Sequence, residues 1–169
     1  MNAFPQIQLM IKMLKSLDHW LGKAAEYAAA RPFDVEVLVQ SRLAPDQYPL
    51  VRQVQAACDT PKFAAAYLST KAPPSHPDTE TTFAQLRQRV ATAVEHLETY
   101  TAADFDGALE RRIAPKMFQG KALSGGDYLL HLALPNFFFH ITTAYSILRH
   151  SGVQIGKTDY IGGLPFLQD

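Results

Sequence analysis

The sequence predicts an all-α protein, a bundle of four long helices that forms one domain over residues 1–169. Apolar residues recur every three or four positions over long segments, signals for strands are sparse, and the breaks between segments contain proline or glycine. The chain is long enough for one domain with a substantial core, and its composition, 47% hydrophobic and 19% charged, is that of a globular protein.

The first helix is predicted over residues 5–29. Its apolar residues form one stripe along the helix, and the Arg31-Pro32 pair ends it because the residue before a proline avoids the α region. The stripe consists of Ile7, Ile11, Leu14, Leu17, Leu21, Ala24 and Ala28. Residues 33–45 then form a connection in which we expect at most a short helical turn.

The second helix is predicted to begin near Asp46, a residue type that caps helix N-termini. The triplet Asp59-Thr60-Pro61 predicts a break and a new helix start, after which the helix resumes. The proline-rich segment 71–79 is expected to be an exposed loop.

The third helix is predicted over residues 80–100, with Thr79 or Asp78 as its N-cap. Residues 101–123 have no clear period, and we expect a short hairpin or an ordered loop there. This segment makes the connection to the last helix a long crossover.

The fourth helix is predicted over residues 125–150, with Ser124 as its N-cap and Gly152 at its end. It is apolar on all sides, which is typical of a helix in the middle of a bundle. The tail, residues 153–169, is rich in glycine but carries large apolar side chains. We expect it to pack on the bundle or on a neighbouring subunit.

Two polar residues interrupt the apolar surface of this fourth helix. Asn136 and His140 lie four residues apart, and such positions differ by only about 40° around a helix. Gln53 falls within the apolar stripe of the second helix. The three side chains are therefore expected to meet inside the bundle, where ligand and metal sites of helical bundles are built.

A catalytic metal site needs three good ligands and an open position. Imidazole is a good ligand, whereas neutral amides are poor ones, so one histidine with two amides predicts a weak site or none. The favoured interpretation is a hydrogen-bonded cluster that fixes the register of two helices.

Other polar residues have a structural interpretation. Arg52 is expected to form a salt-bridge network with Asp46 and Asp59, and the less favoured alternative is an anion-binding arginine at the mouth of a pocket. Cys58 is expected to be a buried thiol, and His131 to lie in the core or an interface. The remaining histidines are weaker candidates for a site: His19, His76, His96 and His150.

Charge and composition exclude several classes of protein. Lys plus Arg and Asp plus Glu both number 16, and the resulting formal net charge of zero argues against a nucleic-acid-binding protein. A single cysteine cannot form an internal disulfide. The N-terminal segment lacks the pattern of a signal peptide, and the polar residues within 128–150 argue against a membrane span. We expect a cytoplasmic protein.

Two long segments, RLAPDQYPLVRQVQAACDTPK (42–62) and LPNFFFHITTAYSILRHSGVQIGKTDYIGG (134–163), carry a family resemblance. With the long N-terminal helix, they resemble an uncharacterised bacterial family, the domain of unknown function numbered nineteen ninety-three. That family is similar to the DinB/YfiT-like superfamily of helical bundles. The resemblance spans nearly the whole chain and implies the same fold.

The resemblance also implies a position for a metal site. Better-known members of the superfamily hold a divalent metal with three histidines, one on the second helix and two on the last, followed by a leucine-arginine pair and a glycine. Here residues 148–149 and Gly152 follow in that order, which aligns His140 with the last ligand, Asn136 with the preceding one and Gln53 with the ligand of the second helix.

Two hypotheses follow for the function. In the first, the protein is a metal-free, altered-site bundle whose Gln53, Asn136 and His140 form a polar pocket for a small molecule or a purely structural cluster. In the second, it is a transferase or hydrolase that depends on nickel, zinc, iron or manganese, with His140 as surviving ligand and Asp46 or Asp59 completing the shell. A homodimer is expected in either case.

Overall fold

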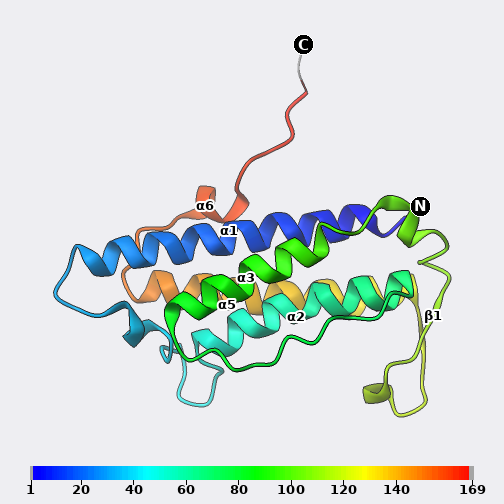
Figure 1. Ribbon diagram of the computed structural model, residues 1–169, viewed down its shortest axis with the longest axis horizontal. Coiled ribbons are helices and arrows are strands. Elements are labelled where there is room, and N and C mark those ends of the chain that lie inside the picture. The colour runs from blue at the N-terminus through cyan, green and yellow to red at the C-terminus, as the bar shows by residue number, and fades with distance from the viewer. Residues whose placement is uncertain (1, 168–169) are drawn as a thin grey trace.

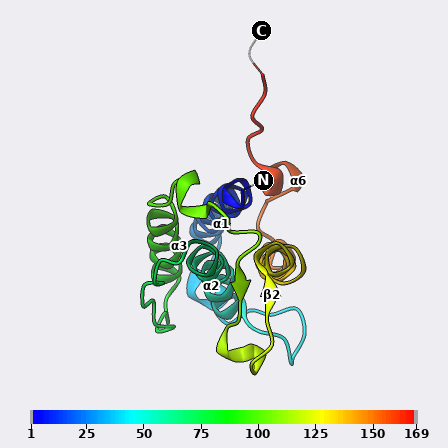
Figure 2. The ribbon, with the colours of Figure 1, turned by 90° about the vertical axis from the view of Figure 1, so that its right-hand side faces the viewer.

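The structure is a computed structural model that describes residues 2–167. Its four long helices lie side by side in a bundle, and the end-on view shows their arrangement in cross-section (Figures 1 and 2). The last one is a composite of three segments. The helices are α1 (Phe4–Ala29), α2 (Leu50–Ser69), α3 (Phe83–Leu97), and α4 (Gly125–Tyr128) continued by the π-helical turn η4 (Leu129–Ala133) and α5 (Leu134–His150). The predicted all-α bundle is confirmed.

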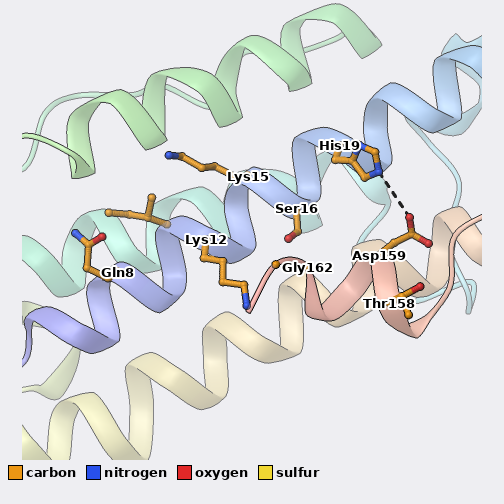
Figure 3. Close-up of a pocket in the computed structure, with 10 residues that line it drawn as sticks. Gln8, Lys12, Lys15, Ser16, His19, Thr158, Asp159 and Gly162 are labelled. Carbon is orange, nitrogen blue, oxygen red and sulfur yellow. Dashed lines mark ion pairs between the residues drawn. The ribbon is translucent and has the colours of Figure 1, made fainter. Parts of the chain in front are cut away.

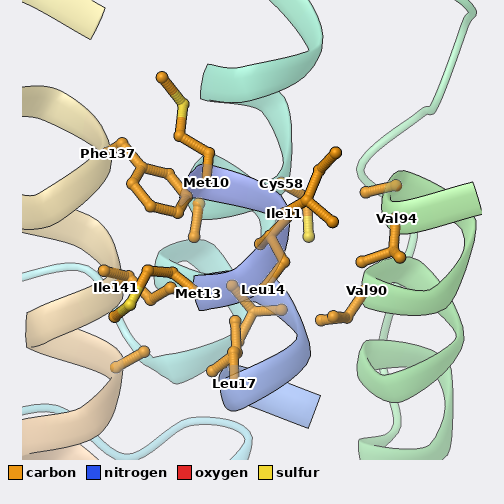
Figure 4. Packing of buried hydrophobic residues seen from close by; sticks show 14 of the residues in the cluster. Met10, Ile11, Met13, Leu14, Leu17, Cys58, Val90, Val94, Phe137 and Ile141 are labelled. Atoms are coloured by element: carbon orange, nitrogen blue, oxygen red, sulfur yellow. The ribbon is translucent and has the colours of Figure 1, made fainter. Parts of the chain in front are cut away.

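Helix α1 supplies the centre of the core, because it packs against α2, α3 and α5. Its side chains point both toward α5 and toward α3 (Figure 4). Leu14 and Leu17 are fully buried, and burial of a leucine contributes about 1.5–3 kcal/mol relative to exposure. Cys58 joins the same core from α2, as expected for a structural thiol. The predicted extent of this first helix, 5–29, agrees with the structure to within one residue at its start.

The connection after α1 contains the expected helical turn. It is the 3-10 helix η1 (Val35–Leu38), and the Asp34 carboxylate accepts a hydrogen bond from the Glu36 amide at its start. The backbone amides of Leu50 and Val51, at the start of α2, donate to carbonyls of this connection. The connection thus fixes where α2 begins.

Helix α2 differs from the prediction at both its start and its middle. It begins at Leu50 with Pro49 as N-cap, not at Asp46, and it runs through Pro61 without the predicted break. Pro61 cannot donate a helical hydrogen bond, but it is buried, and α2 packs on both α3 and α5. Packing along 20 residues outweighs one missing hydrogen bond.

Helix α3 is shorter than predicted because its cap lies further along the chain. Thr82 is the N-cap, and it forms a capping box with Gln85. The Thr82 hydroxyl accepts a hydrogen bond from the Gln85 amide, and the Gln85 side-chain oxygen accepts one from the Thr82 amide. The predicted caps, Thr79 and Asp78, lie in the preceding loop. In that loop, Asp78 forms ion pairs with Arg52 and Arg89.

The crossover between α3 and α4 contains the hairpin that the irregular sequence pattern suggested. Strands β1 and β2 pair antiparallel, with Arg112 opposite Ser124 and Ile113 opposite Leu123. The elements of the crossover are η2 (Ala102–Phe105), β1 (Arg112–Ile113), η3 (Lys116–Phe118) and β2 (Leu123–Ser124). The hairpin lies at the end of the bundle where α2 ends, and its tip extends away from the helices (Figures 1 and 2).

The composite helix α4–η4–α5 begins as predicted, with Ser124 Oγ accepting a hydrogen bond of 3.0 Å from the Asp127 amide. The expectation that it is buried on all sides is wrong. Leu130 is 61% exposed and Phe139 56%. His131 is exposed as well, so of the two places expected for it, the core and an interface, the core is wrong.

The C-terminal segment packs on the bundle through α6 (Lys157–Ile161). Trp20 Nε1 donates to the Asp159 carbonyl at 3.0 Å, and the Trp20 ring stacks on Tyr160 with centroids 5.4 Å apart. Residues 164–167 extend away from the bundle and are exposed (Figure 1). Within residues 2–167, none of the helices combines the length and the apolarity that a membrane crossing requires.

Candidate functional site

Gln53 and His140 meet inside the bundle, as predicted. Gln53 is fully buried on α2 and His140 is 9% exposed on α5. The Gln53 Oε1 and His140 Nδ1 atoms are 2.8 Å apart. The pair therefore joins the two helices through a buried hydrogen bond.

The other end of the Gln53 amide fixes the direction of this bond. Its Nε2 donates to the Tyr48 carbonyl at 3.2 Å, so the oxygen is the atom that faces the imidazole. His140 Nδ1 must then carry a proton and donate it to Gln53. In the neutral ring, Nε2 is left as the acceptor.

The surroundings of His140 favour the neutral ring. Burial lowers the pKa of His140 from its ordinary value of 6.5, and the positive charge of Arg52 lowers it further. A neutral imidazole with one oriented proton matches the single acceptor that Gln53 offers. The pair is a self-contained hydrogen-bonded unit.

Asn136 does not join this pair, although it lies one turn before His140. Its side chain is exposed, and its Nδ2 donates to Thr60 Oγ1 on α2 at 2.7 Å. The expectation of a buried Asn136 is wrong because α5 faces a cavity, not a helix, at this point. The structure thus divides the predicted cluster into a buried pair and a cavity residue.

The cavity that Asn136 lines is a groove of about 730 Å³ between α2 and the composite helix, which we call the α2–α5 groove. One wall follows α2 through Arg52, Ala56, Asp59, Thr60, Phe63 and Tyr67. The opposite wall is Tyr128, Leu132, Ala133 and Asn136, the lip is formed by residues 114–117, and Asp78 lines the groove beside Arg52. Neither member of the Gln53–His140 pair is part of this lining in the described chain, 2–167.

One half of the groove is aromatic. Tyr67 and Tyr128 meet edge to face with centroids 5.7 Å apart, and Phe63 stacks beside Tyr67 at 6.3 Å. Burial raises the pKa of Tyr128 far above its ordinary value, with a further contribution from Tyr67. The hydroxyl therefore stays protonated and is a hydrogen-bond donor.

The other half of the groove is lined by members of a charge cluster, Asp59 and Asp78, that the sequence did not predict. Its centre is Arg89 of α3, only 4% exposed, which contacts Asp59 at 2.7 Å, Glu80 at 3.1 Å and Asp78 at 3.2 Å. Burial opposes the charged form of Arg89, but Asp59 and Glu80 outweigh it and raise its pKa. One signal was present, because Arg89 lies three residues after Leu86, within the apolar stripe of α3.

Two more bases complete this cluster. Lys62 Nζ lies 2.6 Å from Asp59, and Arg52 Nη1 lies 2.5 Å from Asp78. Arg52 therefore pairs with Asp78 of the loop and not, as expected, with Asp46 or Asp59. Its Nη1 also donates to Gln55 at 2.7 Å.

The remaining sequence candidates lie outside the groove. Asp46 is exposed in the turn before α2. Cys58 is buried, and burial raises the pKa of its thiol to about 12, so it is not a nucleophile at neutral pH. His76 and His96 are partly buried and face one another, with ring centroids 6.2 Å apart.

A second cavity, of about 580 Å³, lies between α1 and α6 (Figure 3). Lys12, Lys15 and His19 line it from α1, and Asp159 and Gly162 from the C-terminal segment. Lys15 pairs with Glu98 at 2.5 Å and His19 lies 3.6 Å from Asp159. Both of these basic side chains are more than half exposed, so this cavity is a solvated surface groove.

The residues at the implied metal position do not fit a divalent metal. Of the three side chains, His140 offers one free nitrogen, whereas the Gln53 amide is bonded to His140 and Tyr48. The Asn136 amide nitrogen is bonded to Thr60. Across residues 2–167, no three histidine, cysteine, aspartate or glutamate side chains converge as a metal-ligand set would. Asp46 and Asp59, the expected substitutes, do not complete such a set.

Comparison with known proteins supports the resemblance. A family model described as Domain of unknown function (DUF1993) matches residues 5–161. The chain is also similar to a solved structure described as that of a DinB family member protein from Shewanella denitrificans, with 45% identity over 96% of this chain and 93% of that chain, and a TM-score of 0.92. Among curated proteins, none matches. The chain therefore belongs to the DUF1993 family, and its helical bundle is that of a DinB family protein.

Proposed function

We propose that this protein binds a small molecule in the α2–α5 groove and that it does so without a metal. The observation that carries the proposal is the groove itself, a cavity of about 730 Å³ with aromatic side chains and polar side chains on its walls. Ligand pockets in proteins enclose roughly 300–1,000 Å³, are mostly apolar and contain a few polar groups that orient the ligand.

Several polar groups on the groove walls are available to a ligand. Within the described chain, neither the hydroxyls of Tyr67 and Tyr128 nor the Asn136 Oδ1 atom has a hydrogen-bond partner. Thr60, by contrast, is occupied, since it donates to the Ala56 carbonyl and accepts from Asn136. Two hydroxyl donors and one amide acceptor on residues that line the groove are therefore without a partner and available to a ligand.

The Gln53–His140 pair has a supporting role in this proposal. A buried hydrogen bond between two helices fixes their relative register, and the groove is formed by those same two helices. The pair thus holds the two walls of the groove at a defined separation. Divalent-metal chemistry, as in a transferase or hydrolase, finds no supporting donor set among residues 2–167.

Ligand-observed NMR with a fragment library tests the proposal. We expect fragments to bind the wild-type protein treated with chelator, and binding to be lost in Ala56→Phe, where the added ring fills the groove. Ala84→Phe is the matched control, since Ala84 is exposed on α3 outside the groove. Fragments that bind Ala56→Phe as well as wild type, or that bind only after a metal is added, would contradict the proposal.

The homodimer and the cytoplasmic location stay predictions from the sequence. Light scattering coupled to size-exclusion chromatography measures the first of them, and a mass of 18.8 kDa would identify a monomer.

A further inference from the structure

We infer that the ligand of the α2–α5 groove is an elongated amphipathic anion, with its acidic head at Arg52 and its apolar body along Phe63, Tyr67 and Tyr128. This inference rests on the proposed function and specifies the chemical class of the ligand. It comes from the shape of the groove, from its charge balance and from the hydrogen-bonding state of one arginine.

The groove is long and has two different ends. Its α2 wall runs from Arg52 to Tyr67, which corresponds to roughly 22 Å along the helix axis at 1.5 Å per residue. Arg52, Asp59 and Asp78 lie toward the start of α2, and the rings lie toward its end. A compact ligand would contact only one of these ends, so the shape selects a molecule with a polar head and an apolar body.

The charges at the polar end favour an anion over a cation. The three carboxylates of the cluster, Asp59, Asp78 and Glu80, each contact at least one base at 3.2 Å or less. Three bases balance them, namely Arg52, Lys62 and Arg89. An amine would have to compete with these bases for carboxylates that are already neutralised.

Of the three bases of the cluster, Arg52 is the one that lines the groove. Its Nη1 donates hydrogen bonds to both Gln55 and Asp78, whereas its Nη2 and Nε have no hydrogen-bond partner within residues 2–167. The side chain lines the groove and is 44% exposed, and its guanidinium carbon lies 5.7 Å from the centre of the Tyr48 ring. A guanidinium binds carboxylate or phosphate oxygens through two parallel N–H donors. The bonds to Gln55 and Asp78 hold it in place for this contact.

The aromatic half suits the apolar body of such a ligand. Phe63, Tyr67 and Tyr128 lie in successive contact along the groove, and Leu132 and Met117 continue the apolar wall. Offset or edge-to-face contact with aromatic rings contributes about 0.5–1.5 kcal/mol beyond burial of the surface. Met117 is 73% exposed on the lip, where an occupant would cover it.

Isothermal titration calorimetry with four matched probes tests the inference. The probes are phenyldodecanoate, phenyldodecylamine, phenyldodecanol and butyrate, which differ in the charge of the head or in the apolar body. We expect phenyldodecanoate, whose chain is long enough to follow the groove, to bind at least about tenfold more tightly than the amine or the alcohol, the difference that one charge-assisted hydrogen-bonded pair supplies. Butyrate is expected to bind weakly because it lacks the apolar body.

Two variants separate anion binding from a structural role of the Arg52–Asp78 pair. Arg52→Gln is expected to lower the affinity for phenyldodecanoate about tenfold, since it removes the guanidinium. Asp78→Asn frees that guanidinium and keeps an oxygen for Arg89, so it is expected to raise the affinity. If the pair acted only by holding the groove together, both variants would lower the affinity.

The outcomes distinguish failure of this inference from failure of the proposed function. Equal or tighter binding of the amine, or weakening by both variants, overturns the anion while leaving a ligand-binding groove in place. Absence of binding by all four probes also overturns it, and the fragment screen with Ala56→Phe then decides on the groove itself.

Discussion

The hydrogen bond from His140 to Gln53 ties α5 to α2 at one buried point, and both partners depend on it. Gln53 is fully buried, with its amide oxygen on His140 and its amide nitrogen on the Tyr48 carbonyl. A buried polar group that loses its partner costs about 1–3 kcal/mol, more than the bond itself contributes. The position therefore tolerates few other residues.

We expect Gln53→Leu to lower the free energy of unfolding by about 1–3 kcal/mol, because His140 Nδ1 and the Tyr48 carbonyl lose their partner. Urea denaturation measures this change. Gln88→Leu is the control, since Gln88 is exposed on α3 and, among the residues that the structure describes, its side chain bonds only to Thr92. Equal stability of the two variants would show that the pair contributes nothing to the bundle.

The histidines predict how stability depends on pH. Burial lowers the pKa of His76, His96 and His140, and nearby positive charges, such as Lys62 beside the first two, lower it further. Below the ordinary pKa of 6.5, the unfolded chain takes up protons that the folded protein does not, so the free energy of unfolding decreases as the pH falls.

We expect the urea midpoint to be lower at about pH 5.5 than at about pH 7.5, a window above the titration of ordinary carboxylates. The double variant His76→Gln/His96→Gln should show a smaller decrease, because two of the three rings no longer take up protons. A decrease of the same size in the double variant would assign the pH dependence to other groups.

At this residue scale, the sequence predicted burial of Gln53, His140 and Cys58 correctly from helical periodicity. It misplaced Asn136, because periodicity identifies a face of a helix but not what that face meets. Arg89 was missed for a related reason. A buried arginine is stabilised by carboxylates from α2 and the loop, and no pattern within α3 reveals them.

Among the elements, the start of α4 has the tightest packing requirement. A Cβ atom on Gly125 would lie 1.8 Å from the Ala108 carbonyl oxygen, whereas one on the neighbouring Gly126 would meet nothing closer than 3.6 Å. The Gly126 amide also donates to the Leu109 carbonyl at 2.8 Å. The crossover and the composite helix thus pack backbone against backbone here.

We expect Gly125→Ala to destabilise the protein by at least about 3 kcal/mol, because backbone must move to admit the methyl group. Gly126→Ala is the matched control, with the same change in chain entropy and a much smaller steric effect. Thermal or urea unfolding measures both. Similar stabilities would mean that α4 and the crossover are not in this close contact.

The elements themselves were predictable where local signals and packing agree. The first helix was predicted almost to the residue, and Ser124 was identified as a cap, because an apolar stripe and a capping residue each act locally. The break at Pro61 and the caps at Asp46 and Thr79 were wrong. In those places packing of α2 on its neighbours, or a better cap at Thr82, outweighed the local signal.

At the scale of the whole molecule, the groove arises from how three segments meet. Helix α2, the composite helix and the lip at 114–117 are far apart in the sequence, and only their assembly encloses the cavity. The sequence therefore predicted the bundle and the pair at its centre, but not the groove beside them. The same assembly places the charge cluster at one end and the aromatic rings at the other.

Ligand binding in the groove without a metal is tested by the dissociation constant of a groove-binding fragment, measured by calorimetry with chelator and again with added zinc. We expect equal affinities under the two conditions, and loss of binding in Ala56→Phe under both. Binding that requires zinc and disappears in His140→Ala would contradict it, because the imidazole would then act as a metal ligand and not as the partner of Gln53.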